Sequence, residues 1–190
     1  MKPIYLRNVP PPSETFDHVN LLQFLAGWVR PVRYLELGVR TGESFLEVAP
    51  YCTEAIAVDS APLQFNLPPN AVYHQMLTDD YFKSIEGQSL KFDMVFIDAD
   101  HTFEQSYIDF LNVKDLVVED GFVFFHDTYP VKELAIPALC SSVYKTAIAV
   151  RENFGHEWEI VTLPFNPGLT IAKKIFNKTG MPWELTPPVI

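Results

Sequence analysis

Residues 32–59 read VRYLELGVRTGESFLEVAPYCTEAIAVD, and this stretch decides the fold of the chain. Its first apolar residues predict a short buried strand, which carries the acid Glu36 near its end. Gly38 and Gly42 then predict a tight turn before an amphipathic segment, and Asp59 closes a second apolar strand. A strand, a glycine turn that opens a helix, and an acid at the tip of the next strand form a nucleoside-binding half-unit, whose acid binds a ribose diol. We therefore expect a cofactor that contains adenosine.

The spacing of the glycines distinguishes between cofactors. A dinucleotide-binding turn has the pattern G-x-G-x-x-G, whereas here Arg40 takes the central place and no third glycine follows. The form Glu36-x-Gly38-x-x-x-Gly42 instead resembles motif I of the class I S-adenosylmethionine (SAM)-dependent methyltransferases. This resemblance implies that Glu36 lies near the amino acid end of SAM and that Asp59 holds its ribose. The further cofactor contacts that we expect around this turn are Gly38, Arg40, Thr41, Gly42, Ser44 and Ser60.

Length and composition predict one globular domain. The 190 residues suffice to bury most apolar surface in a single core, and 48% of them are hydrophobic. A net charge of −10 argues against a nucleic-acid partner, which requires a basic face. The sequence has no apolar run long enough to span a membrane and no signal-peptide pattern, so we expect no membrane partner and a cytoplasmic location. Cys52 and Cys140 lack C-x-x-C spacing, which predicts neither a disulfide framework nor a zinc site.

The rest of the chain alternates between strand and helix patterns. Predicted strands cover residues 32–37, 55–58, 71–74, 92–98, 121–126, 157–163 and 169–174. Predicted helices cover 16–29, a segment from Thr78, 102–115 with a capping box from Thr102 to Gln105, and about 131–150, where Pro137 disturbs the start. This is the pattern of an α/β, Rossmann-like, doubly wound seven-stranded sheet, mostly parallel with a C-terminal antiparallel hairpin. We divide the single domain 1–190 into a helical lead-in 1–31, a core 32–176 and an irregular tail 177–190.

A second constellation follows the fourth and fifth predicted strands. Asp98 ends one of them, and His126 and Asp127 end the other. Because adjacent parallel strands lie about 4.8 Å apart, we expect these groups to converge at the ligand-binding edge of the sheet. Two carboxylates and an imidazole suit a divalent cation such as Mg²⁺, which would bind and orient a substrate hydroxyl. The alternative is that these acids are ordinary turn residues after strands.

The phrases FDMVFIDADHTFEQSYIDF, at residues 92–110, and GFVFFHDT, at 121–128, resemble the metal-dependent small-molecule O-methyltransferases, in particular the branch acting on sugars and antibiotic precursors. The resemblance implies metal ligands at Asp98, His126 and Asp127, and a general base at His101. Lysine is usual in place of His101, and an acid or amide in place of His126. An imidazole near its normal pKa accepts a proton readily at neutral pH, so the first replacement is chemically reasonable.

The expected function is methyl transfer from SAM to a hydroxyl of a small molecule. In relatives, residues matching Thr78 and Asp79 contact the adenine side of SAM, Asp98 also lies beside the cofactor, and the helix carrying His18 approaches the active site. The alternatives are a SAM-binding domain without transferase activity, an NAD-dependent enzyme and a metal phosphohydrolase. The acceptor and the oligomeric state, a homo-oligomer included, stay open at the level of sequence.

Overall fold

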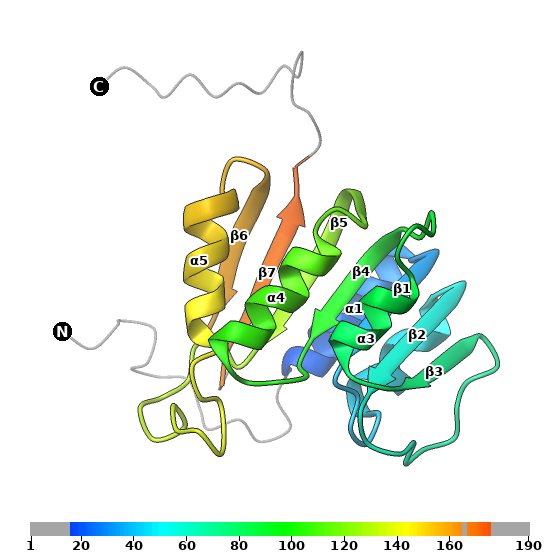
Figure 1. Ribbon diagram of the computed structural model, residues 1–190, viewed down its shortest axis with the longest axis horizontal. Helices are drawn as coiled ribbons and strands as arrows, with labels where there is room; N and C mark the ends of the chain where they lie inside the picture. Colours follow the sequence, from blue (N-terminus) through cyan, green and yellow to red (C-terminus); the bar gives the residue numbers. More distant parts are fainter. Residues whose placement is uncertain (1–15, 165–166, 176–190) are drawn as a thin grey trace.

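The computed structural model describes residues 16–164 and 167–175, and they form one seven-stranded sheet between two layers of helices (Figure 1). The strand order is β3-β2-β1-β4-β5-β7-β6. The first five strands pair in parallel, and β7 runs antiparallel between β5 and β6. The strands are β1 (Arg33–Leu37), β2 (Glu54–Asp59), β3 (Ala71–Gln75), β4 (Phe92–Ile97), β5 (Val117–His126), β6 (Trp158–Leu163) and β7 (Leu169–Lys174). The predicted mostly parallel sheet with a terminal antiparallel hairpin is confirmed.

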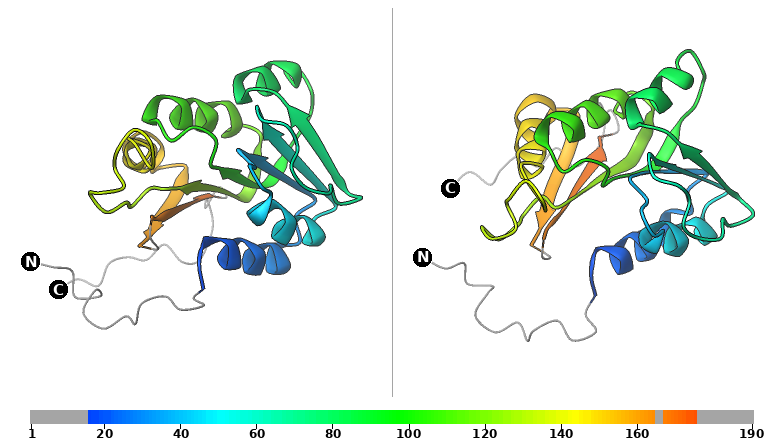
Figure 2. Two further views of the ribbon diagram at one scale, coloured as in Figure 1. Left: turned by 90° about the horizontal axis from the view of Figure 1, so that it is seen from below. Right: turned by 60° about the horizontal axis from the view of Figure 1, so that its bottom comes forward.

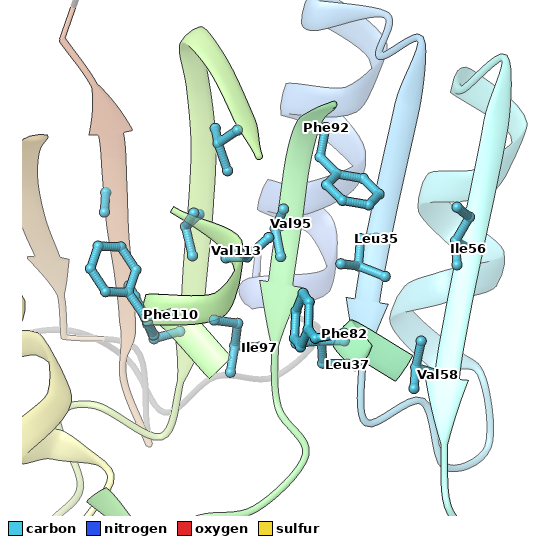
Figure 3. Close-up of a cluster of buried hydrophobic side chains, with 14 of the residues drawn as sticks. Leu35, Leu37, Ile56, Val58, Phe82, Phe92, Val95, Ile97, Phe110 and Val113 are labelled. Atoms are coloured by element: carbon cyan, nitrogen blue, oxygen red, sulfur yellow. The ribbon is translucent and has the colours of Figure 1, made fainter. Parts of the chain in front are cut away.

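Helices cover both faces of this sheet (Figure 2). One face carries α3 (Thr78–Ser84), α4 (Phe103–Val113) and α5 (Tyr144–Phe154), whereas the other carries α1 (His18–Val29), α2 (Glu43–Val48) and the short 3₁₀ helix η2 (Ala49–Tyr51). Central strands with helices on both faces need apolar side chains pointing both ways. In β4, Val95 and Ile97 belong to the cluster under α3 and α4 (Figure 3), while Met94 and Phe96 belong to the cluster under α1 and α2.

Helix ends follow local sequence signals. Asp17 caps α1 by accepting a hydrogen bond from the Asn20 backbone N–H, and the Asn20 side chain accepts one from the Asp17 backbone N–H in return. Thr102 caps α4 in the same way, accepting from the Gln105 backbone N–H at 3.3 Å. The Gln105 side chain does not complete the predicted capping box, because its amide points to α3 instead.

Two predicted element boundaries were wrong. The helix expected around residues 131–150 exists only as α5, and the segment before it is a series of turns. Pro137 lacks an N–H and disfavours a helical residue before it, which explains the late start. Strand β5 begins at Val117, ahead of the predicted Gly121, with a register shift opposite Phe92 and Met94.

Other sequence expectations lie partly outside the described residues. The expected turn FNPG includes Phe165 and Asn166, and the expected tail begins at Asn177; these positions are outside the part of the chain that the structure describes. Within the described ranges, no helix is both long and apolar enough to cross a membrane.

Candidate active site

The candidate site lies at the carboxyl ends of the parallel strands, where strand order reverses between β1 and β4. Two adjoining cavities open there, with volumes of about 220 Å³ and about 720 Å³. Gly38, Asp59 and Ala99 line both of them, so a single elongated ligand can extend from one cavity into the other.

Gly38 lets two strand ends approach each other. Its φ is +82°, in the left-handed region that favours glycine, and a Cβ there would lie 2.3 Å from the Asp98 backbone oxygen. The sequence predicted Gly38 as a turn residue and cofactor contact, and the structure adds its close approach to the β4 backbone. The turn after β1 therefore packs directly against the end of β4.

Asp59 organises the glycine turn from the tip of β2. Its Oδ2 accepts hydrogen bonds from the backbone N–H groups of Val39 and Arg40, both at 2.8 Å, and its Oδ1 accepts one from Ala61. Burial opposes ionisation of this carboxyl, but these backbone donors outweigh it and lower its pKa. The turn and the predicted ribose-binding acid are thus one connected unit, and Asp59 is ionised and faces both cavities.

Glu36 is completely buried below the turn rather than in the cavity wall. Its carboxylate accepts hydrogen bonds from the hydroxyls of Tyr34 and Ser44, both at 2.5 Å. Burial raises the pKa of Glu36 to about 8, even though the Ser44 and Tyr34 hydroxyls favour the charged form. Ser44 does line the larger cavity. The geometry therefore favours an indirect role, in which Glu36 orients Ser44 towards a ligand.

The smaller cavity contains the predicted adenine-side residues. Ser60, Thr78 and Asp79 line it, next to the apolar side chains of Met76 and Leu77. No sequence motif had indicated either apolar residue as part of the site, nor Gln105, which lines the same cavity from α4. Their position directly after β3 was the available signal for Met76 and Leu77, because parallel strands present ligands at their carboxyl ends.

The larger cavity contains a ring of alternating acids and imidazoles. His126 Nδ1 lies 3.1 Å from Asp98 Oδ1 and 3.2 Å from Asp127 Oδ1. His101 Nδ1 lies 3.1 Å from Asp127 Oδ2, and His101 Nε2 lies 3.5 Å from Asp98 Oδ1. The structure thus brings together all four residues that the sequence predicted for catalysis and metal binding.

The charges of these four groups depend on one another. The hydrogen bond to Asp98 is the largest cause that raises the pKa of His101 to about 9, against the effect of burial. Burial lowers the pKa of His126, but the interaction with Asp98 outweighs it and the net shift is upward. For Asp98 burial raises the pKa, and the hydrogen bonds from His101 and His126 reverse that shift. Asp98 therefore favours the protonated form of both imidazoles.

The donor atoms also suit a metal ion. Among the described residues, Asp98, His101 and Asp127 each offer a ligand atom, and these atoms all lie within 4.8 Å of one another. His126 is the third ligand that the sequence predicted, and its Nδ1 lies close to both carboxylates. Two carboxylates with one or two imidazoles are a common ligand set for divalent cations. The site thus fits a divalent cation.

Several residues of the larger cavity come from outside the predicted motifs. His18, at the start of α1, places its ring 4.1 Å from the His126 ring, centroid to centroid. Leu139 and Cys140 belong to the turns between β5 and α5, and the Leu139 carbonyl oxygen lies 2.7 Å from His101 Nδ1. The sequence pointed to His18, but a helix was predicted where Leu139 lies in a loop.

The model of a family described as a methyltransferase domain matches residues 35–128. A comparison with the sequences of curated proteins finds no significant match.

Solved structures share the fold at low sequence identity. The SAH-bound methyltransferase PaMTH1 of Podospora anserina has a TM-score of 0.66 at 16% identity, over 83% of this chain and 78% of that chain. An O-methyltransferase from Bacillus cereus in complex with SAH has a TM-score of 0.65 at 14% identity, over 88% and 83%. TomG from Streptomyces achromogenes, an O-methyltransferase involved in tomaymycin synthesis and solved with SAM, has a TM-score of 0.65 at 16% identity, over 89% and 82%.

The fold and the family match define the class of protein. Residues 35–128 form a methyltransferase domain, and the whole described chain has the fold of the class I SAM-dependent methyltransferases. The resemblance to the class I SAM-dependent methyltransferases, drawn from the glycine turn, is confirmed.

Proposed function

We propose that this protein is an O-methyltransferase that transfers the methyl group of SAM to a hydroxyl of a small molecule. One observation carries the proposal: the acid–imidazole ring and the glycine turn line the same cavity. A methyl donor bound at the turn and a hydroxyl held at the ring would therefore meet. Because methyl transfer is a direct displacement, proximity and alignment of the two reactants supply much of the rate.

The cofactor would extend across both cavities. Its adenine would occupy the smaller one, and its ribose would lie at Asp59, which lines both. Its amino acid end would lie in the larger cavity beside Ser44, with Arg40 and Thr41 in the adjacent wall.

A divalent cation is part of this proposal. Asp98 and Asp127 would hold it together with an imidazole of the ring, His126 in the first instance. Such a cation supplies one kind of chemistry, which is to orient an acceptor hydroxyl and lower its pKa.

His101 is the proposed proton acceptor. Its position between two carboxylates keeps it protonated at neutral pH, since its pKa is raised to about 9. A divalent cation held by Asp98 and Asp127 would neutralise their charge and so remove the cause of that pKa shift. The imidazole of His101 could then lose its proton and accept the proton of the hydroxyl. His101 Nδ1 also lies 2.7 Å from the Leu139 carbonyl oxygen, which holds the ring in the cavity.

The first test separates SAM binding from methyl transfer. We expect Asp127→Ala to lower kcat/KM for methyl transfer at least about a hundredfold, because a ligand of the hydroxyl-binding centre is lost. The affinity for SAM, measured by calorimetry, should change little. Asp115→Ala is the matched control, since this aspartate is exposed with a side-chain accessibility of 76% and lies before β5, at the other end of the strand from His126. Unchanged turnover in Asp127→Ala, on any acceptor from a panel of sugars and phenols, would contradict the proposal.

The second candidate function is a SAM-binding domain without transferase activity of its own. The engagement of both His101 ring nitrogens by Asp98 and Asp127 favours it, because a protonated imidazole accepts no proton. Calorimetric binding of SAM, with no methyl transfer to the panel at any divalent cation concentration, would support this candidate. Heat on adding NAD and none on adding SAM would contradict both candidates.

A further inference from the structure

The side chain of Gln105 crosses from α4 to the start of α3 and closes the smaller cavity. Its Nε2 lies 3.2 Å from Thr78 Oγ1, 3.1 Å from Asp79 Oδ1 and 3.1 Å from Asp109 Oδ1. All three neighbours are oxygens, and two of them belong to carboxyl groups. The amide nitrogen is therefore surrounded by hydrogen-bond acceptors.

This environment fixes which way the amide points. An amide oxygen in the place of Nε2 would face the carboxyl oxygens of Asp79 and Asp109, whereas the NH₂ group can donate one hydrogen to each of them. Gln105 Oε1 must then lie on the other side. Within the described ranges, no protein donor is hydrogen-bonded to Oε1. Because Gln105 lines the smaller cavity, Oε1 is the amide atom left to accept a hydrogen bond from a ligand there.

Asp109 is the deepest member of this network. The side chain is completely buried on α4, and its Oδ2 has no hydrogen-bond partner among the described residues. Burial raises the pKa of Asp109 to about 6, against the hydrogen bonds from Thr78 and Gln105. The carboxyl is hence mostly ionised at neutral pH and accepts from the Gln105 amide.

We propose that Gln105 is a specificity-determining residue, which accepts a hydrogen bond from the exocyclic 6-amino group of the cofactor's adenine, and that Asp109 is the positioning residue that holds its amide in this orientation. The inference rests on the proposed binding of SAM and adds the group that recognises its base. Met76 and Leu77 supply an apolar surface in the same cavity for the faces of the purine ring. Asp79 lies beside Gln105 and offers a second acceptor to the same amino group.

The chemistry of this wall discriminates between purines. A 6-amino group has two N–H donors, which match the acceptors of Gln105 and Asp79. A 6-oxo group presents an oxygen there, and it would face two acceptors without a donor between them. Leaving polar groups unpaired in a buried site discriminates more strongly than the loss of an apolar contact. Wild-type protein should therefore bind the adenine form of the cofactor product more tightly than the hypoxanthine form.

The test compares S-adenosylhomocysteine with S-inosylhomocysteine by calorimetry. We expect wild-type protein to prefer the adenine compound by about tenfold or more, which is the scale of one or two buried hydrogen bonds. Gln105→Leu keeps a similar side-chain volume but removes the acceptor, and it should reduce this preference to about threefold or less. The matched control is Gln88→Leu, since the Gln88 amide bonds the Ser84 carbonyl oxygen on an exposed surface. Circular dichroism confirms that each variant is folded.

The outcomes are distinguishable. If wild-type protein binds neither compound, the proposed function fails and this inference fails with it. If wild-type protein prefers the adenine compound and Gln105→Leu keeps the full preference, only the assignment of Gln105 is overturned.

Asp109 has a separate readout. Asp109→Asn retains a side-chain oxygen for the Gln105 amide and should retain the preference between the two compounds. Asp109→Leu removes that oxygen and should lower the preference towards that of Gln105→Leu. Equal preferences in folded Asp109→Asn and Asp109→Leu would overturn the positioning role.

Discussion

At the scale of single residues, the buried carboxyl of Glu36 shows how burial and hydrogen bonding compete. Tyr34 and Ser44 donate to both of its oxygens, yet its pKa is raised from 4.5 to about 8 because burial dominates. A carboxyl with a raised pKa binds a proton more tightly in the folded state than in the unfolded state. Its contribution to stability is therefore fully present below about pH 4.5 and is lost as the pH rises through about 8.

We predict that Glu36→Gln becomes more favourable as the pH rises. Relative to wild type, its free energy of unfolding should increase by a few kcal/mol between pH 5 and pH 8, since one unit of pKa corresponds to about 1.4 kcal/mol. Urea unfolding at both values of pH measures the difference. The control is Glu119→Gln, which changes an exposed glutamate of β5. A difference between Glu36→Gln and wild type that does not vary with pH would contradict the dominance of burial.

At the scale of elements, the ends of β1 and β4 are built together. Gly38 has φ +82°, and an added Cβ would lie 2.3 Å from the Asp98 backbone oxygen and 2.4 Å from Ala99 Cα. Both obstacles are backbone atoms, so no side-chain rotation relieves the clash. Gly87 has a similar φ of +77° but no atom within 4 Å of its added Cβ. Alanine substitutions at the two glycines therefore distinguish the free-energy cost of the left-handed backbone conformation from that of the clash with β4.

We predict that Gly87→Ala lowers the free energy of unfolding by about 1 kcal/mol, the cost of a left-handed conformation with a Cβ. Gly38→Ala should cost several kcal/mol more, because the end of β4 must also move. Urea unfolding measures both. Gly38→Ala should in addition weaken SAM binding, since Gly38 lines both cavities. Equal losses of stability in the two variants would show that the approach of β4 is unimportant.

The elements differ in how well the sequence predicted them. Strands β1, β2 and β4 were predictable because their apolar runs and terminal acids are local signals. Asp98, His126 and Asp127 were predictable as residues that end strands, whereas His101 was indicated only by the family resemblance. The segment between β5 and α5 was not, because Pro137 interrupts a helical pattern and the loop is held by distant partners, such as His101 at Leu139. Gln105 was expected to cap α4. Its actual partners on α3 depend on packing between helices, which no spacing within α4 reveals.

At the scale of the whole molecule, the sheet topology places two imidazoles and two carboxylates together at one site of an acidic chain. The net charge is −10, and the parallel strands β4 and β5 place Asp98, His126 and Asp127 at one edge of the sheet, where His101 completes the ring.

Imidazole ligands favour Mn²⁺ or Zn²⁺ over Mg²⁺, which prefers oxygen ligands and retains its waters. We therefore predict that Mn²⁺ binds more tightly than Mg²⁺ and raises the melting temperature at lower concentration. A ligand that binds only the folded state stabilises it by about 2.7 kcal/mol when its concentration is a hundred times its dissociation constant. Thermal unfolding in a chelated buffer, followed by titration with each ion, makes the measurement. Asp98→Asn should abolish most of the effect, whereas His156→Gln, which removes an exposed imidazole that pairs with Glu157, should preserve it. Stronger stabilisation by Mg²⁺ than by Mn²⁺ would exclude the imidazoles as ligands. The protein ligands of the ion would then be the two carboxylates alone.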